Sequence, residues 1–329
     1  MDTLNHFHIN HQYASVGKKI EKVTNIRNKI LITGGSGFIG SALTSKLSGH
    51  KNNEIYVLDI EEPKTNLDIK YKKIDIRSDK IKDYFQEIKP DKIIHLAAQA
   101  SVAISSKDPV LDNDVNVGGS LNILKSALEL KLTQFVFFST GGAIYGEKVG
   151  RKFNEDDTVD PQSPYGMSKS SFEKYLTYYS DKFNLPSTVI RPSNVFGPGQ
   201  NPYGEAGVVS IFGKKMLENE PVTIFGTGNE YRDYIYIDDV VDFIEKITQG
   251  NITGTYNLCS GQKTKTIDIF NSLKEIVDYK DEPVMSNSRE GDIFGIELDN
   301  SKALGISNWK PKTSLQEGLN KTISHLKNS

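Results

Sequence analysis

The sequence predicts an α/β fold in which a doubly wound parallel sheet carries a smaller, mixed C-terminal portion. From Lys29 to Arg191, short apolar segments alternate with helical segments, the pattern of a parallel sheet covered by helices on both faces. A glycine-rich turn, TGGSGFIG (33–40), joins the first apolar segment to the first helix. After Arg191 the alternation loosens, with Pro- and Gly-rich stretches at 192–207 and 225–229. This last portion is expected to cap the carboxyl edge of the sheet, where such folds bind ligands.

The elements follow from the period of the apolar residues. Apolar runs of strand length occur at 29–33, 54–59, 72–75, 92–97, 134–139 and 187–191. Helical stretches separate them: one that ends near Leu47, then 80–88, about 109–130, and 165–183.

Bulk composition excludes several classes of protein. The chain has 329 residues, enough for one large domain or two modest ones, and its formal net charge of −2 offers no non-specific nucleic-acid surface. It has no apolar run long enough to span a membrane and no signal-peptide core, and its single cysteine, Cys259, fits a reducing cytosol. We therefore expect a cytoplasmic protein without membrane insertion. His6, His8 and His11 lack accompanying carboxylates or cysteines, so we expect a flexible polar tail there and no metal site.

The glycine-rich turn predicts a dinucleotide site. Gly34, Gly37 and Gly40 follow a strand and open a helix, which lets the backbone approach a pyrophosphate at the helix N-terminus. The second strand ends at Asp59, 19 residues past Gly40, where a carboxylate can accept hydrogen bonds from the adenosine ribose. A 2′-phosphate would meet Asp59 and further acids at 61 and 62, so NAD is expected rather than NADP. The alternative is a plain strand–helix turn with a solvated acid; the Rossmann-type context favours the cofactor.

Two Tyr-x-x-x-Lys pairs compete for a catalytic role. Tyr165 and Lys169 are one helical turn apart, and so are Tyr178 and Lys182. The 13 residues between the pairs correspond to roughly 220° of rotation, so the two pairs face different directions. At most one of them can face a given site.

The ordered motifs of the chain resemble the extended short-chain dehydrogenase/reductases that modify nucleotide sugars, among them the UDP-glucose 4-epimerase type. The resemblance covers about residues 29–321. Besides the glycine turn, it rests on DI (75–76), HLAAQ (95–99), NVGGS (116–120), FST (138–140), YG (145–146), YGMSK (165–169), RPSNVFGP (191–198), RDYI (232–235) and REGD (289–292).

The resemblance implies roles for individual residues. The implied NAD-binding residues are Gly34, Gly37, Phe38, Ile39, Asp59, Asp75, Ile76, Leu96, Ala97, Ala98, Gln99, Tyr165, Lys169 and Pro192. The implied nucleotide-sugar residues are Asn194, Val208, Thr223, Phe225, Arg232, Arg289, Asp292 and Ile296. Arg232 and Arg289 would bind the diphosphate, which suits a chain with only six arginines among 40 basic residues.

The same resemblance implies a domain division. Residues 1–28 would be a polar extension. Residues 29–191 would form the NAD-binding domain and also receive about 234–258. Residues 192–233 and 259–329 would form the nucleotide-sugar-binding portion.

The resemblance selects the first tyrosine pair, because Tyr165 and Lys169 match the family's catalytic pair and Tyr178 and Lys182 do not, and the chemistry of the pair supports this choice. Tyrosine has an unperturbed pKa of about 10, and a nearby lysine cation and the nicotinamide ring both favour its phenolate. Tyr165 would take the proton of the sugar 4-hydroxyl while C4 gives its hydride to NAD, and the 4-keto sugar would turn before the hydride returns. Tyr178 is expected to be a packing residue together with Tyr175 and Tyr179.

One position departs from the family pattern. Family members usually carry Ser or Thr four residues before the tyrosine of the Tyr-Gly pair, and here this position is Gly141. Thr140, Ser139 or a water could supply the missing hydroxyl, and Thr140 is the first choice. Gly142 and Ala143 replace the acids of the related dehydratases and decarboxylases, which argues against both activities.

The leading hypothesis is an NAD-dependent UDP-hexose 4-epimerase. The alternatives are a nucleotide 4-keto-sugar reductase and a non-catalytic NAD-binding sensor on the same fold. Ile296, at the position that lies near the sugar C2 substituent in the family, is smaller than tyrosine and suggests that UDP-GlcNAc and UDP-GalNAc are also accepted. The resemblance further implies a homodimer formed by the helices after Pro109 and from Tyr165, with apolar positions at Leu121, Leu124, Ala127 and Leu128.

Overall fold

The computed structural model describes residues 28–328 except 65, 148–149, 204–206 and 289–292. His6, His8 and His11 of the predicted extension lie outside the described residues. Within the described part of the chain, no helix is long and apolar enough to cross a membrane. No group of three or more His, Cys, Asp or Glu side chains there could hold a metal ion.

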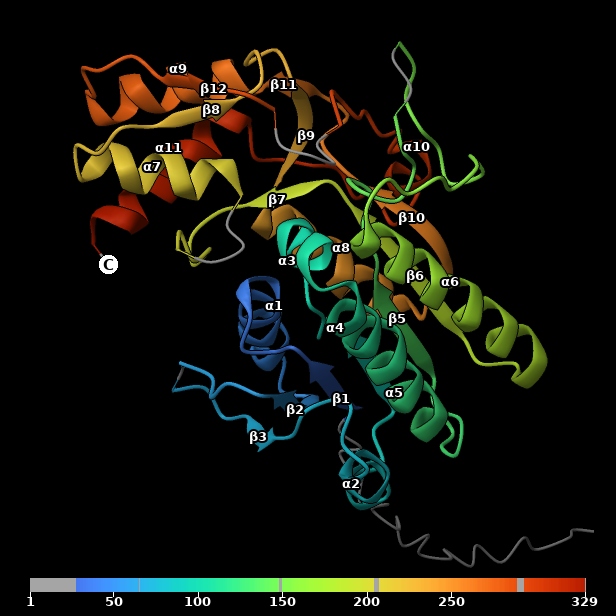
Figure 1. The fold of residues 1–329 in the computed structure, drawn as a ribbon. Helices are drawn as coiled ribbons and strands as arrows, with labels where there is room; N and C mark the ends of the chain where they lie inside the picture. The colour runs from blue at the N-terminus through green and yellow to red at the C-terminus, as the bar shows by residue number, and fades with distance from the viewer. Residues whose placement is uncertain (1–27, 65, 148–149, 204–206, 289–292, 329) are drawn as a thin grey trace, which may run out of the picture.

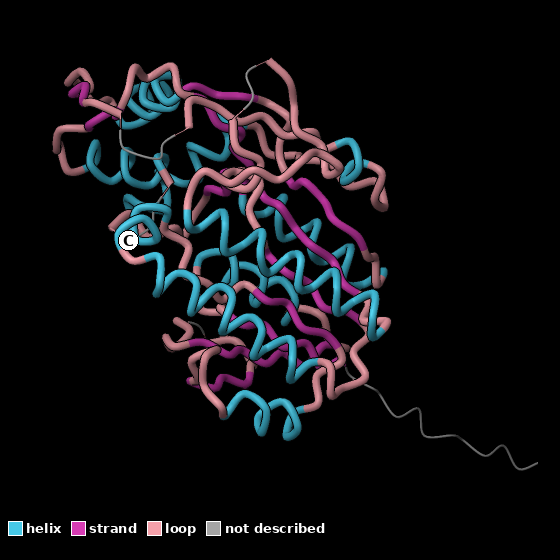
Figure 2. Tube along the Cα trace, turned by 45° about the vertical axis from the view of Figure 1, so that its right-hand side comes forward, coloured by secondary structure: helices cyan, strands magenta, loops and turns pink. Residues whose placement is uncertain are grey.

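A parallel seven-stranded sheet forms the centre of the larger lobe and confirms the predicted fold class (Figures 1 and 2). Its strands, in the order β10-β6-β5-β4-β1-β2-β3, are Gly254–Leu258, Ser187–Pro192, Gln134–Phe138, Lys92–His95, Asn28–Thr33, Asn53–Asp59 and Lys70–Lys73. The third predicted strand lies two residues earlier than expected, and its largely exposed residues fit its place at the edge. The last strand, β10, returns from the C-terminal half to pair with β6.

Helices cover both faces of the sheet, and each face has its own apolar core (Figure 2). On one face lie α1 (Phe38–Ser48) and α8 (Ile237–Gly250), which contact each other. On the other lie α2 (Lys80–Ile88), α5 (Ser120–Ala127) and α6 (Pro164–Phe183). Both faces of the parallel strands are thereby removed from water, as their continuous apolar runs require.

The long helix predicted over 109–130 is interrupted by a wider turn. The structure has α3 (Val102–Lys107) and α4 (Pro109–Asn113), then a π-helical turn, η1 (Asp114–Gly119), before α5. A Cβ on Gly119 would lie 2.6 Å from the Ile76 side chain, so glycine permits the close approach of this turn to the sheet. π-Helical turns are frequent at functional sites, and this one carries Asn116 toward the carboxyl edge.

A smaller lobe begins where β6 ends and sits beyond the carboxyl edge of the sheet (Figure 1). It contains a three-stranded sheet of β7 (Asn194–Phe196), β9 (Tyr231–Tyr236) and β11 (Lys263–Lys265), and a two-stranded sheet of β8 (Thr223–Phe225) and β12 (Val284–Ser286). Its helices are α7 (Val208–Leu217), α9 (Thr266–Val277) and α11 (Leu315–Lys327), which contact one another, whereas the short α10 (Ser301–Leu304) lies against β10 of the central sheet.

A buried carboxylate fastens the two lobes. Asp233 of β9 accepts hydrogen bonds from the Ser193 hydroxyl (3.1 Å), from the backbone and hydroxyl of Ser260 (2.8 and 2.9 Å) and from the Gly261 backbone (2.7 Å). Ser193 follows β6 and Ser260 follows β10, so one side chain joins the ends of two central strands to the smaller sheet.

Candidate active site

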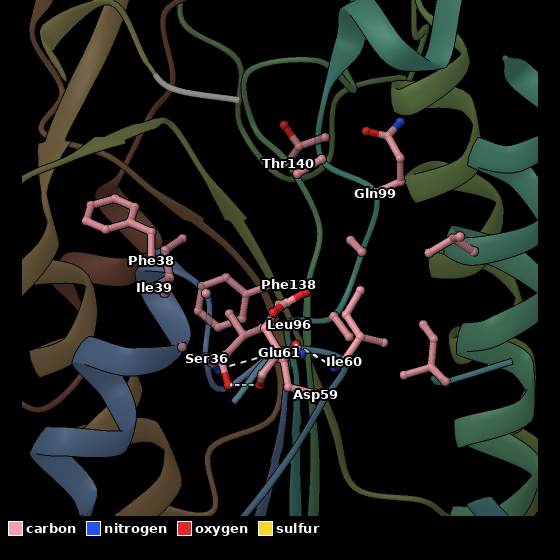
Figure 3. Close-up of a pocket in the computed structure, with 18 of the residues that line it drawn as sticks. Ser36, Phe38, Ile39, Asp59, Ile60, Glu61, Leu96, Gln99, Phe138 and Thr140 are labelled. Atoms are coloured by element: carbon pink, nitrogen blue, oxygen red, sulfur yellow. Dashed lines mark hydrogen bonds between the residues drawn. The ribbon is translucent and has the colours of Figure 1, made fainter. Parts of the chain in front are cut away.

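A cavity of about 740 Å³ opens at the carboxyl edge of the sheet. All the side chains predicted to bind NAD line this cavity, and Thr140 does too. The structure therefore brings together residues that are spread from position 34 to position 192 in the sequence. Figure 3 shows the cavity extending from Asp59 and Glu61 at one end to Thr140 and Gln99 at the other.

Two glycines of the turn, Gly34 and Gly40, leave no room for a side chain, whereas Gly37 is less crowded. A Cβ on Gly34, whose φ is +72°, would lie 2.6 Å from the Ala97 backbone, and one on Gly40 would lie 2.0 Å from the Gly34 carbonyl. Gly37 precedes α1, and a Cβ there would meet only the Gly34 carbonyl, at 3.3 Å. The turn thus fits a pyrophosphate approaching the N-terminus of α1.

Backbone amides hold the Asp59 carboxylate in place (Figure 3). Its Oδ2 accepts from the Ser36 amide at 2.9 Å, and its Oδ1 accepts from the amides of Ile60 (2.7 Å) and Glu61 (3.1 Å). The Ser36 hydroxyl donates to the Glu61 carbonyl at 2.7 Å, so the turn and the end of β2 form one unit. The fixed Asp59 carboxylate can accept hydrogen bonds from the two hydroxyls of a ribose, and its negative charge repels a 2′-phosphate.

An arginine that sequence reasoning did not assign lines the same end of the cavity. The Arg77 guanidinium donates to both oxygens of Asp75 and, at 2.9 Å, to Asp114. The hydrogen bond from Arg77 lowers the pKa of Asp75. Because two carboxylates already engage this guanidinium, it does not offer a free cation for a 2′-phosphate.

Tyr165 and Lys169 lie on the first turns of α6 and line the cavity. Ser163 caps the helix by accepting from the Gly166 amide at 3.2 Å, and Pro164 occupies the first helical position. The Lys169 side chain is buried, with its ammonium 4.6 Å from the centre of the Phe137 ring. Burial lowers the pKa of Lys169 to about 8, whereas the charges of Glu173 and Asp112 raise it.

The competing pair lies on the surface. Tyr178 is 53% exposed, and its hydroxyl accepts from Lys182 at 3.0 Å. The pair does not line the cavity, in agreement with the different facing of the two pairs. As expected of a packing residue, the Tyr178 ring lies against Tyr179, with ring centroids 5.2 Å apart, and Tyr179 packs against the core. Tyr175 and Tyr178 are nevertheless exposed in this chain, because this side of α6 faces away from the sheet.

A buried histidine ties together the segments beneath the cavity. His95, at the end of β4, lies 2.6 Å from the Thr33 hydroxyl through Nδ1 and 2.8 Å from the Ser120 hydroxyl through Nε2. Burial, and to a lesser extent the charge of Lys169, lowers the pKa of His95 to about 3, so the ring is neutral. It therefore links β1, β4 and α5 without adding a charge near Lys169.

The structure shows why a hydroxyl is absent at position 141. A Cβ on Gly141 would lie 2.4 Å from Leu298 Cδ1 and 2.8 Å from the Arg191 carbonyl. The next residue back, Thr140, lines the cavity, and so does Ser139, whose buried Oγ has no hydrogen-bond partner within the described residues. Both residues therefore belong to the cavity wall, and the alternation of side chains along this extended segment turns the Thr140 hydroxyl toward the cavity.

The predicted nucleotide-sugar residues that the structure describes do not share the cavity with the predicted NAD-binding residues. Asn194, Val208, Thr223, Phe225 and Arg232 lie in the smaller lobe and do not line the described cavity. Arg289 and Asp292 lie outside the described residues, although the Arg232 guanidinium donates to the Ile293 carbonyl (2.9 Å) just beyond them.

Ile296 does not form a wall of the cavity as expected. It is 2% exposed and packs in an apolar cluster with Tyr145, Phe153 and Leu298. The adjoining Gly295 lies directly against the Tyr231 ring, and neighbouring residues of an extended segment point to opposite sides. This alternation turns Ile296 into the interior.

Sequence reasoning missed several residues that line the cavity. They include Ser36, Arg77, Val115, Gln200 and Asn201. Ser36 lies inside the glycine motif, and Gln200 and Asn201 lie in the Pro- and Gly-rich stretch after β6. Their places next to these motifs could have indicated that the three residues line the site.

Comparisons with known proteins agree with this geometry. The model of the NAD dependent epimerase/dehydratase family matches residues 30–259. A UDP-glucose 4-epimerase of Mycolicibacterium smegmatis is 35% identical, over 91% of this chain and 99% of the relative. Among solved structures, a Thermotoga maritima UDP-glucose 4-epimerase with UDP-glucose is 40% identical, with a TM-score of 0.87 over 91% of this chain and 99% of that one. A Thermus thermophilus UDP-glucose 4-epimerase in complex with NAD is 35% identical, with a TM-score of 0.86 over 92% and 99%.

The matched region includes the whole cavity wall from the glycine turn to Asn201, and these similarities extend over both lobes. The chain therefore belongs to the NAD-dependent epimerase/dehydratase family, within which it is an NAD-dependent nucleotide-sugar 4-epimerase.

Proposed function

We propose that this enzyme interconverts UDP-glucose and UDP-galactose by inverting the sugar at C4. The observation that carries the proposal is the position of Tyr165 and Lys169 in the same cavity as the glycine turn and Asp59. The names of the relatives support this pair of sugars, since the proteins at 35% and 40% identity are UDP-glucose 4-epimerases, whereas a UDP-N-acetylglucosamine 4-epimerase in the comparison is 26% identical. Ile296, the residue that suggested acceptance of the N-acetylated sugars, is buried and does not support it.

In this proposal the chain moves a proton and holds the sugar. NAD, when bound, accepts and returns the C4 hydride. Tyr165 removes the proton of the 4-hydroxyl and later returns one, and the Lys169 ammonium stabilises the phenolate form of Tyr165. Thr140 hydrogen-bonds the sugar 4-oxygen, and Asn194, Arg232, Arg289 and Asp292 bind the nucleotide diphosphate and ribose. Val208, Thr223 and Phe225 lie against the nucleoside.

A conversion assay tests the proposed function directly. Purified enzyme is incubated with UDP-glucose and no added cofactor, and the mixture is analysed for UDP-galactose; UDP-GlcNAc is run in parallel. We expect UDP-galactose to appear, because the net reaction neither consumes nor releases reducing equivalents. Oxidation of added NADPH by a nucleotide 4-keto sugar, without epimerisation of any UDP-hexose, would identify a reductase. Binding of NAD without any turnover would identify a sensor.

The base assignment is tested by Tyr165→Phe. We expect turnover to fall by roughly 10²–10⁴-fold, because the phenol that carries the proton is gone. Folding and bound NAD should be retained, as judged by circular dichroism and by the nucleotide released on denaturation. Tyr178→Phe is the matched control: it removes an exposed phenol from the same helix and should leave turnover unchanged. Activity of Tyr165→Phe within a few-fold of the wild type would exclude Tyr165 as the base.

The hydroxyl assignment is tested by two neighbouring substitutions. Thr140→Val keeps the shape and removes the donor, and we expect a loss of about 10- to 100-fold in kcat/KM, the worth of a hydrogen bond to a developing charge. Gly141→Ser restores the family's residue but forces its Cβ against Leu298 and the Arg191 carbonyl, so the melting temperature should fall and activity should not rise. A stable, faster Gly141→Ser enzyme would show that the hydroxyl belongs at position 141.

We also propose that the enzyme is a homodimer built on α4 and α6. Leu124 and Ala127, which the sequence suggested for an interface, are buried against the chain's own sheet. The exposed apolar side chains of α4 and α6 are instead Val110, Leu111, Met167, Tyr175, Tyr178 and Phe183. Light scattering at micromolar concentration should give twice the chain mass of 36.7 kDa. Met167→Glu with Tyr175→Glu should shift the protein toward monomer, whereas Leu304→Glu on α10 should not; a wild-type monomer would contradict the proposal.

A further inference from the structure

An arginine bound to two carboxylates borders the adenosine end of the cavity. The Arg77 guanidinium donates to Asp75 Oδ2 through Nη2 (2.6 Å) and to Asp75 Oδ1 through Nε (3.0 Å). The Arg77 backbone amide also donates to Asp75 Oδ1, at 2.9 Å, and Nη1 donates to Asp114 of η1 at 2.9 Å. A guanidinium that binds one carboxylate through two nitrogens fixes the plane of that carboxylate, which a lysine ammonium cannot do.

The backbone around Arg77 is held by contacts of its own with η1 and α5. The Asn122 side chain of α5 donates to the carbonyls of Ile76 (2.9 Å) and Ser78 (2.7 Å). Gly119, at the end of η1, lies so close to Ile76 that a Cβ there would be 2.6 Å from its side chain. These contacts fix the main chain of the segment, and the two-point bond from the guanidinium then fixes the carboxylate that the segment presents.

The base of the cofactor is expected beside this segment. Asp59 ends β2 and is placed to bind the adenosine ribose, and β3 is the strand next to β2. The residues that follow β3, 74–77, line the cavity together with Asp59. A base attached to that ribose therefore meets the side chains of two isoleucines and the Asp75 carboxylate. An ionised carboxylate only accepts hydrogen bonds, so it matches the 6-amino group of adenine and repels the 6-oxo group of hypoxanthine.

We propose that Arg77 is a positioning residue, which holds the Asp75 carboxylate in the orientation that binds the adenine 6-amino group and thereby makes the cofactor site select adenine over a 6-oxo purine. Arg77 acts through Asp75, because its own nitrogens are engaged by Asp75 and Asp114. The inference goes beyond the proposed function: it rests on NAD binding in this cavity and not on which sugar is converted, so either can fail without the other.

The test is a competition between NAD and nicotinamide hypoxanthine dinucleotide, which carries a 6-oxo group in place of the 6-amino group. The holoenzyme is equilibrated with an excess of both dinucleotides, free nucleotides are removed by rapid filtration, and the bound ones are released by denaturation and quantified by chromatography. We expect the wild type to prefer NAD by about 10- to 100-fold, because a charge-assisted hydrogen bond is replaced by repulsion. In Arg77→Gln the carboxylate can turn away from either base, so this preference should fall by about fivefold or more.

Two further variants separate positioning from a merely structural role. Arg77→Lys keeps the charge without the planar fork, and we expect it to lower the preference as well. Asp75→Asn should also lower it, and adding Arg77→Gln to Asp75→Asn should lower it no further, because the arginine acts through that carboxylate. A structural role alone would weaken the binding of both dinucleotides equally and leave their ratio as in the wild type.

Arg151→Gln is the matched control. Arg151 is also an exposed arginine that is paired with a carboxylate, Asp157, but it does not line the described cavity, so the preference should stay unchanged. A wild type without preference for NAD, an unchanged ratio in Arg77→Gln, or a further loss of preference in the double variant would overturn the proposal. The failure of both Arg77 variants to fold or to retain a dinucleotide would also count against it, because it would assign Arg77 to the stability of the segment.

Discussion

Burial of the Lys169 ammonium is the constraint on which the rest of the site depends. A cation removed from water is destabilised, and the pKa of Lys169, lowered to about 8, reflects this cost. The surroundings offset it by different means: the Phe137 ring lies 4.6 Å from the ammonium, and the charges of Glu173 and Asp112 raise the pKa of Lys169. The pKa of Lys169, at about 8, therefore lies close to neutral pH.

A buried hydrogen-bond network fixes α6 on the sheet. Arg191 of β6 binds Glu173 of α6 and donates to the Tyr145 hydroxyl at 2.7 Å. That hydroxyl donates in turn to Asn257 of β10 at 2.7 Å. A buried network of this kind is stable only when its members are satisfied, so its integrity sets the position of the helix. Because Lys169 lies one turn from Glu173, the helix cannot shift without disturbing both groups of charges.

Features that depend on residues close together in the sequence could be predicted, whereas contacts between distant segments could not. The strands, the glycine turn and Asp59 depend on period and spacing within short segments, whereas the choice of Tyr165–Lys169 over the second pair came from the family resemblance. The structure places the glycine turn, Asp59, Tyr165 and Lys169 around one cavity. The partners Asp112–Gln99, Arg77–Asp114 and Ser36–Glu61 depend on which segments pack together, which no local pattern contains. The burial of Ile296 was missed for the same reason.

The segment after β5 shows how packing decides which residue can supply the proposed catalytic hydroxyl. Ser139 and Gly141 both donate their amides to β6 or the residue at its end, at 2.8 and 2.7 Å, so this segment continues the parallel ladder. In an extended chain, neighbouring side chains point to opposite sides. Position 141 faces Leu298 and the Arg191 carbonyl, which leaves room only for glycine, and Thr140 consequently faces the cavity. The departure from the family pattern at Gly141 and the hydroxyl at Thr140 are thus two consequences of one backbone alignment, fixed by β6 and by the cluster around Leu298.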